Sequence, residues 1–232
     1  MQFISSKKNS LSNLGYIGFA ISGTKEQRHI GIAYRASVNE VMIVDLGFHR
    51  MLKNDTADDD EPWYWAEFGL DEINQEIIAK RISYLAAKHQ SNRALPSDIQ
   101  YGFIYNGTYF DEGDEYTRNK MGEGLTCATF VLAVFKKLGL QFLDEESWLP
   151  REEEDAEWHR RIIDLMEELK IQFSIPDGHI EALKKNIGNG VRFKPEEVAG
   201  SGVVFFNENR DDCIKYTEGS EIGKKVLCQI FD

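Results

Sequence analysis

Residues 125–138 are LTCATFVLAVFKKL, a stretch that is apolar almost all round for three helical turns. Such a helix is typical of a protein interior, because no face of it is suited to water. Thr126 is a favourable N-cap, Gly139 ends the pattern, and Lys136 and Lys137 complement the negative end of the helix dipole. We therefore predict a buried helix against which the rest of the chain packs.

Three β-rich segments precede this helix, at residues 14–22, 29–35 and 40–46. Turn-forming residues separate them, which predicts three sequential antiparallel strands. Periodicity and composition predict further helices at 70–89, 151–170 and 177–187, and further strands at 101–105, 202–207 and 226–231. Together these elements predict an α+β fold in which an antiparallel sheet packs on the buried helix.

Charge and composition narrow the class of protein. The chain has 232 residues, 42% of them hydrophobic, enough for the core of one domain. Its net charge of −12 argues against nucleic acid and anionic membranes as partners. Two segments, 55–72 and 144–157, hold eight carboxylates each. No secretory signal and no apolar run long enough to cross a bilayer are present, so we expect a cytoplasmic protein without an integral membrane segment.

Cys127 stands in the first turn of the predicted buried helix, directly after the glycine-rich loop 122–124. Unpaired N–H groups and the positive dipole end of a helix stabilise a thiolate and can hold the oxyanion that its attack on a carbonyl creates. The position also suits an inert core cysteine, because Cys127 lies in register with Phe130, Val131 and Val134. The other cysteines, Cys213 and Cys228, form no C-x-x-C pair with it, and we expect reduced thiols and no metal site.

A thiolate nucleophile needs a general base, and imidazole suits that role at neutral pH. His29 opens a predicted strand and lies at a rigid strand end. Asp45, near the end of the next strand, is the expected partner that orients His29, with His49 as the alternative. The three other histidines have simple surface or capping explanations: His89, His159 and His179.

Two motifs carry a family resemblance. Gly124-Leu-Thr-Cys127-Ala-Thr-Phe130-Val131 resembles the nucleophile helix of the NlpC/P60-type papain-like cysteine hydrolases, and His29-Ile-Gly-Ile-Ala-Tyr34 is similar to their histidine strand. The histidine precedes the cysteine here, as in the circularly permuted branch that includes the lecithin:retinol acyltransferase-like proteins and bacterial YiiX/YebB-like hydrolases. The resemblance implies a permuted papain-like core over residues 1–143, with 144–232 as an α/β extension packed on the same domain.

The resemblance also implies an activity, with Cys127 as nucleophile, His29 as general base and Asp45 as orienter. Asp stands where the family more often has His, Asn, Gln or Glu. The expected reaction is acyl transfer on a peptide, amide or other acyl compound, by a thiol-dependent hydrolase that needs no cofactor. The sequence leaves three questions open: whether the enzyme is a hydrolase or an acyltransferase, which acyl group it accepts, and its oligomeric state.

Four aromatic residues are predicted to bind the substrate, although the tryptophans equally suit a cap over the core. They are Tyr16, Trp63, Trp65 and Tyr105.

The alternative is a non-enzymatic binding or immunity-type protein whose acidic segments bind a basic protein partner. It predicts that Cys127 is inert and that charge reversal at 58–61 or 152–155 abolishes function. A third interpretation keeps the hydrolase fold without its chemistry.

Overall fold

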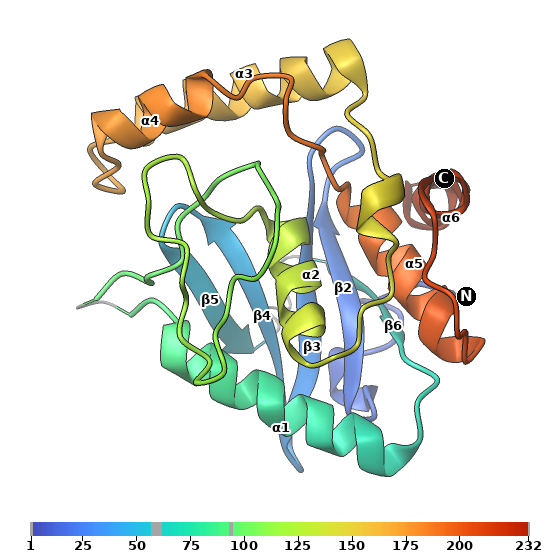
Figure 1. Ribbon diagram of the computed structural model, residues 1–232. Helices are drawn as coiled ribbons and strands as arrows, with labels where there is room; N and C mark the ends of the chain where they lie inside the picture. Colours follow the sequence, from blue (N-terminus) through green and yellow to red (C-terminus); the bar gives the residue numbers. More distant parts are fainter. Residues whose placement is uncertain (1, 57–61, 93–94, 232) are drawn as a thin grey trace.

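One antiparallel sheet with helices packed against it forms the fold (Figure 1). The computed structural model describes residues 2–56, 62–92 and 95–231. Within them the chain is α+β, as predicted, and six strands pair in the order β1-β6-β2-β3-β4-β5, every neighbouring pair antiparallel. The strands are β1 (Ile4–Ser5), β2 (Ile17–Gly23), β3 (Arg28–Ser37), β4 (Glu40–Phe48), β5 (Met51–Thr56) and β6 (Tyr64–Glu67).

The three strands predicted before the buried helix are confirmed as β2, β3 and β4. In β2, Ile17, Phe19 and Ile21 face the main core, whereas Ala20 belongs to a smaller apolar cluster. This alternation is the period-2 pattern of a strand with both faces covered. The predictions missed β1, β5 and β6, because β1 is two residues long and β5 (MLKNDT) carries little apolar character.

The four helices predicted from periodicity are also confirmed, as α1 to α4. Thr126 caps α2, as predicted. In the described residues the α-helices are α1 (Glu72–His89), α2 (Cys127–Lys137), α3 (Glu152–Leu169), α4 (Asp177–Lys184), α5 (Pro195–Asn207) and α6 (Tyr216–Phe231).

Residues 202–207 and 226–231, predicted as strands, are helical. The first segment is the second half of α5, which begins at Pro195, and Gly202 lets this helix approach the sheet, since a Cβ there would lie 2.2 Å from the Phe19 ring. The second segment ends α6, whose buried Ile222, Val226 and Ile230 recur every fourth residue. Short apolar runs do not distinguish a strand from a buried helix, which explains both errors.

The predicted strand at 101–105 is also absent. Tyr101 forms only an isolated parallel bridge with Leu125, and the chain around it is irregular. Gly102 lies within the segment and Gly107 follows it, and both glycines favour a loop over a strand.

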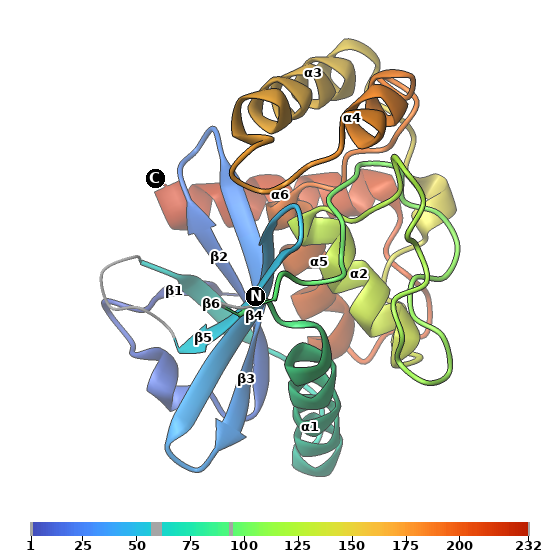
Figure 2. The same ribbon diagram turned by 90° about the vertical axis from the view of Figure 1, so that its left-hand side faces the viewer.

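The main core lies between the sheet and the helices. Helix α2 packs against β3 and β4, α5 lies beside α2, and α1 packs on β3 and crosses below α2 in the view of Figure 1 (Figures 1 and 2). Helices α3 and α4 cross above one end of the sheet. A group of phenylalanine rings, with centroids 4.5–5.9 Å apart, joins β2, α2 and α5: Phe19, Phe68, Phe135, Phe142 and Phe206.

Candidate active site

A close backbone approach positions the start of α2. The N–H of Leu125 donates to the carbonyl of Gln100 at 2.9 Å, and the N–H of Gly102 donates to the carbonyl of Leu125 at 3.3 Å. Gly124, with φ of +156°, lies so close to this segment that a Cβ would come within 2.5 Å of the Tyr101 carbonyl carbon. Only glycine fits this position, so the glycine-rich loop fixes where the next helix begins.

The first turn of α2 leaves hydrogen-bond donors beside the thiol. Thr126 and Thr129 form a reciprocal capping box, in which each side-chain oxygen accepts from the other residue's backbone N–H (3.1 and 2.7 Å). The box satisfies these two N–H groups and leaves those of Cys127 and Ala128, which have no partner within the helix. Together with the helix dipole, they can stabilise negative charge next to Cys127.

His29 and Asp45 meet across neighbouring strands. Because β3 pairs Ile32 with Val44, the two residues are diagonal neighbours near the end of the sheet. Gly31 leaves their contact open, since a Cβ there would lie 3.2 Å from the Asp45 Cβ. His29 Nε2 donates to Asp45 Oδ1 at 2.7 Å, with 27% of the histidine side chain and 7% of the aspartate side chain exposed.

The electrostatics of His29 connect it to Cys127. Burial alone would lower the pKa of the imidazole. The negative charge of Cys127, the hydrogen bonds with Asp45 and Cys127, and the charge of Asp45 outweigh burial and raise the pKa of His29 to about 10. Since Asp45 holds Nε2, the nitrogen available to the thiol is Nδ1. The ring is therefore an imidazolium at neutral pH, between a carboxylate and the thiol.

A cavity of about 420 Å³ opens beside this group. Burial and the negative charge of Cys127 raise the pKa of Tyr101 in its wall, so the phenol stays a neutral donor. The wall has an apolar part from α3 and a cationic part, and its main side chains are Arg28, His29, Phe48, Met51, Lys53, Tyr101, Cys127, Trp158, Ile162, Leu165, Arg192 and Phe193.

No family model, curated protein or solved structure gives a match to this chain.

The four aromatic residues predicted to bind substrate do not line this cavity. Trp63 and Trp65 are buried, with the Trp63 ring 6.2 Å from that of His29. Tyr16 lines a different hollow, and Tyr105 stacks on Tyr109 with ring centroids 5.2 Å apart. Trp63 thus lies near His29 without lining the cavity, and the aromatic side chains of the wall come from other segments.

The apolar stripe of the helix predicted at 151–170 indicates ordinary core packing for Trp158, Ile162 and Leu165, together with Met166 and Leu169, so the α3 side of the cavity was missed from the sequence. In the structure Ile163 and Met166 carry that core stripe, and the three missed residues form a second, half-buried line beside it. Neighbouring apolar residues such as Ile162 and Ile163 lie on different sides of a helix. Such a pair indicates that the apolar surface of α3 extends beyond the face that packs in the core.

His49 is not the partner of His29. Its Nδ1 accepts from the N–H of Tyr101 at 3.4 Å, and its ring centroid lies 4.8 Å from that of His179. Burial first, then the charges of His179 and Arg50, lower its pKa to about 3. Of the two candidates for orienting His29, only Asp45 contacts it.

Surface or capping roles for the remaining histidines are wrong, because all three are buried. His89 is held between the Asp98 carboxylate at 2.8 Å and the Asp114 carbonyl at 2.7 Å. His159 stacks on Phe103 at 3.9 Å, and burial lowers its pKa to about 4. These rings are structural members of the interior. His179 likewise bonds the Tyr101 carbonyl at 2.8 Å.

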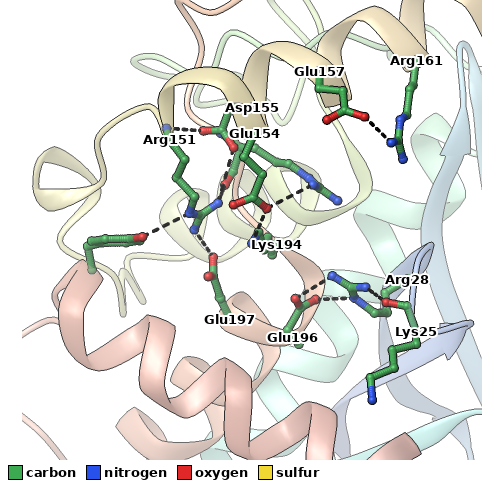
Figure 3. A network of polar contacts seen from close by, with 12 residues as sticks. Lys25, Arg28, Arg151, Glu154, Asp155, Glu157, Arg161, Lys194, Glu196 and Glu197 are labelled. Atoms are coloured by element: carbon green, nitrogen blue, oxygen red, sulfur yellow. Dashed lines mark hydrogen bonds and ion pairs between the residues drawn. The ribbon is translucent and has the colours of Figure 1, made fainter.

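The acidic segment 144–157 is extensively paired within the molecule (Figure 3). Arg151 lies within 2.6 Å of Glu197 and 3.6 Å of the buried Asp155, and Glu154 pairs with Lys194 at 2.6 Å. Cations also pair with Glu145, Glu153 and Glu157, the last two at the exposed surface of α3. Part of the negative charge of this segment is therefore paired within the molecule. The other acidic run, 58–61, lies outside the described residues.

Within the described ranges, no three His, Cys, Asp or Glu side chains gather closely enough to hold a metal ion. None of the described helices combines the length and the apolar character that a membrane span requires.

Proposed function

We propose that this protein is a cysteine hydrolase of the amidase or peptidase type. Cys127 is the nucleophile, His29 the general acid and base, and Asp45 the residue that orients His29. The observation that carries the proposal is the His29 ring between the Asp45 carboxylate and the Cys127 thiol, with its pKa raised to about 10. An imidazolium beside a cysteine at a helix N-terminus favours the reactive thiolate.

The order of the elements supports a permuted papain-like fold for this enzyme. The strand that carries the base, β3, precedes the helix that carries the nucleophile, α2, and α2 packs on the antiparallel sheet. These relations agree with the resemblance of the two sequence motifs to the permuted cysteine hydrolases.

The chemistry follows from the contacts. The Cys127 thiolate attacks the carbonyl carbon of an amide, ester or thioester, and a carbon–sulfur bond forms while the carbonyl oxygen becomes an oxyanion. The N–H groups of Cys127 and Ala128 stabilise that charge. His29 Nδ1 donates its proton to the leaving group, the bond to the leaving group breaks, and an acyl-enzyme remains.

Hydrolysis of the acyl-enzyme returns the site to its starting state. Neutral His29 removes a proton from water, and the resulting hydroxide attacks the thioester carbonyl. The carbon–sulfur bond then breaks, which releases the acid and restores the thiolate beside the imidazolium. Asp45 keeps Nδ1 directed at the reacting atoms throughout, because its carboxylate holds Nε2.

Alkylation by iodoacetamide, read by peptide mass at each cysteine, tests the ion pair. An ordinary thiol is about 500-fold less ionised at pH 5.5 than at pH 8.5. We expect Cys127 to keep most of its alkylation rate at pH 5.5 and to lose about tenfold or more of it in His29→Ala. The exposed Cys228 is the internal standard. A Cys127 rate that falls in parallel with that of Cys228 contradicts the proposal.

Acylation tests the reaction itself. We expect p-nitrophenyl acetate to release one equivalent of p-nitrophenol per chain in a burst and to leave an acetyl group on Cys127. Cys127→Ala should abolish the burst, whereas the matched Cys228→Ala should keep it. A burst that persists in Cys127→Ala assigns the chemistry to another residue and overturns the proposal.

A further inference from the structure

The cavity beside Cys127 has a charge opposite to that of the whole protein. The chain carries a net charge of −12. Yet three of the side chains that line the cavity are the cations Arg28, Lys53 and Arg192, and among the described residues no carboxylate lines it. Clefts lined by one sign of charge concentrate ligands of the opposite sign. The cavity wall is therefore suited to an anion.

The three cations differ in how far they are already neutralised. Arg28 is fully engaged, because its Nε and Nη2 donate to the Glu196 carboxylate at 2.9 and 2.8 Å (Figure 3). Lys53, which is exposed at the cavity rim, forms no ion pair with any described residue. Among the described residues, no carboxylate neutralises Lys53 at the cavity rim.

Arg192 is only weakly paired inside the cavity. Its closest described carboxylate oxygen, on Glu154, is 3.9 Å away, beyond hydrogen-bond distance, and the same oxygen already bonds Lys194 at 2.6 Å. The guanidinium lies 4.8 Å from the centroid of the Trp158 ring, with 15% of the side chain exposed. This cation–π contact holds the guanidinium over the ring and needs no N–H···O hydrogen bond from it.

The apolar part of the wall adjoins this guanidinium. Trp158, on which Arg192 stacks, continues along α3 into Ile162 and Leu165, and all three line the cavity with Cys127. A ligand that matches this wall has an apolar portion beside α3 and an anionic group within reach of Arg192. A planar guanidinium fork binds carboxylate or phosphate oxygens in pairs.

We propose that the acyl donor of Cys127 carries an anionic group, a carboxylate or a phosphate, which Arg192 binds while the apolar portion lies against Trp158 and Ile162. This inference rests on the proposed function and names the substrate class of the same site. Lys53, at the cavity rim, strengthens the attraction. Arg192 is thus a specificity-determining residue and takes no part in the bond-breaking steps.

Two alkylating reagents that are nearly equal in size but differ in charge test the inference. Iodoacetate is an anion and iodoacetamide is neutral, so the ratio of their rate constants at one cysteine reports the local charge and does not require a known substrate. We expect this ratio at Cys127 to exceed that at the exposed Cys228 by about tenfold. A ratio at Cys127 no greater than that at Cys228 overturns the inference.

Substitutions separate Arg192 from the imidazolium of His29, which also attracts iodoacetate. Arg192→Gln should lower the ratio about threefold to tenfold, and Arg192→Lys should retain most of it. Arg210→Gln, which removes the same charge from an arginine paired with Glu208 outside the cavity, should leave it unchanged. If Arg192→Gln fails to fold, Lys53→Gln at the rim must still lower the ratio. An unchanged ratio in the folded cavity variants overturns the inference.

Competitors identify the anionic group. Glutarate or inorganic phosphate at millimolar concentration should slow alkylation of Cys127 by iodoacetamide, and the stronger protector identifies a carboxylate or a phosphate. Protection by neither contradicts the inference. If the charge tests fail but Cys127 still reacts at pH 5.5, only this inference is overturned and the proposed hydrolase stands. If Cys127 reacts with neither reagent, the proposed function and this inference are both contradicted.

Discussion

Replacing Asp45 by Asn removes the charge next to His29 and keeps the shape of the side chain. Asp45 accepts from His29 Nε2 at 2.7 Å with 7% of its side chain exposed, so solvent screens the pair weakly. A hydrogen bond to a charged group contributes about 1.5–3 kcal/mol. Since one pH unit corresponds to about 1.4 kcal/mol, we expect the pKa of His29 to fall from about 10 by roughly one to two pH units.

An NMR titration of the imidazole Hε1 signals measures this change directly. His29→Gln assigns the His29 signal by its absence. The low pKa values of His49 and His159, about 3 and about 4, keep those signals out of the alkaline range. The exposed Asp55 on the adjoining strand offers a matched control, because Asp55→Asn removes the same charge without contacting the ring.

A pKa of His29 that is equal in Asp45→Asn and in the control variant would refute this reasoning. It would mean that Cys127 alone keeps the imidazole protonated. A second measurement gives the functional consequence, since a less basic His29 supports less thiolate at low pH. We therefore expect Asp45→Asn to slow alkylation of Cys127 at pH 5.5 more than at pH 8.5.

Three further substitutions test the framework of the site. Gly124 and Gly139 both have positive φ, but a Cβ at 124 meets backbone within 2.6 Å and one at 139 meets nothing within 4 Å. Gly139→Ala should therefore lower the free energy of unfolding, measured in urea, by about 1 kcal/mol, and Gly124→Ala should lower it by several kcal/mol more. Equal losses would contradict the close contact of Gly124 with the backbone of residues 100–102. Arg151→Met leaves the buried Glu197 carboxylate without its partner and should lower the unfolding free energy by about 3 kcal/mol. The control Arg161→Met breaks an exposed pair and should lower it by less than about 0.5 kcal/mol. Equal losses in the two variants would contradict a stabilising role for the buried ion pairs. In the folded protein the buried His49 has a pKa lowered to about 3, so it stays neutral at pH 5. In the unfolded chain the same imidazole takes up a proton below about pH 6.5. Stability should fall from pH 6.5 toward pH 5 with a contribution from this ring that approaches about 1.4 kcal/mol per pH unit, and an unchanged slope in His49→Asn would contradict it.

Local pattern was sufficient for part of the fold. Strands β2 to β4 and helices α1 to α4 follow from alternation, helical spacing and caps such as Thr126, because each element carries its own signal. The apolar run at 202–207 carries no such signal, since its helix is defined by Pro195 upstream and by packing of Gly202 on Phe19. Tertiary contacts decide such segments, and they are not readable from a short window.

The same distinction applies to the candidate site. Cys127 was predictable from a helix start, and the meeting of His29 with Asp45 follows from the register of adjacent strands. Nothing near residue 192 in the sequence indicates that its guanidinium stacks on Trp158, because the two come together only when the chain after α4 returns along α3. The proposed catalytic residues were thus easier to predict from the sequence than the residues that shape the cavity.

The opposite charges of the cavity and the whole molecule have a kinetic consequence. At long range an anionic molecule meets the field of a protein with net charge −12, and only inside the cavity does it meet Arg192 and Lys53. The Debye length is about 8 Å at physiological ionic strength, so added salt weakens the distant repulsion more than attraction at contact. Association of an anion with this cavity should therefore accelerate as salt is first added, the reverse of ordinary electrostatic steering. Discrimination by charge begins only after the ligand has crossed a repulsive outer field.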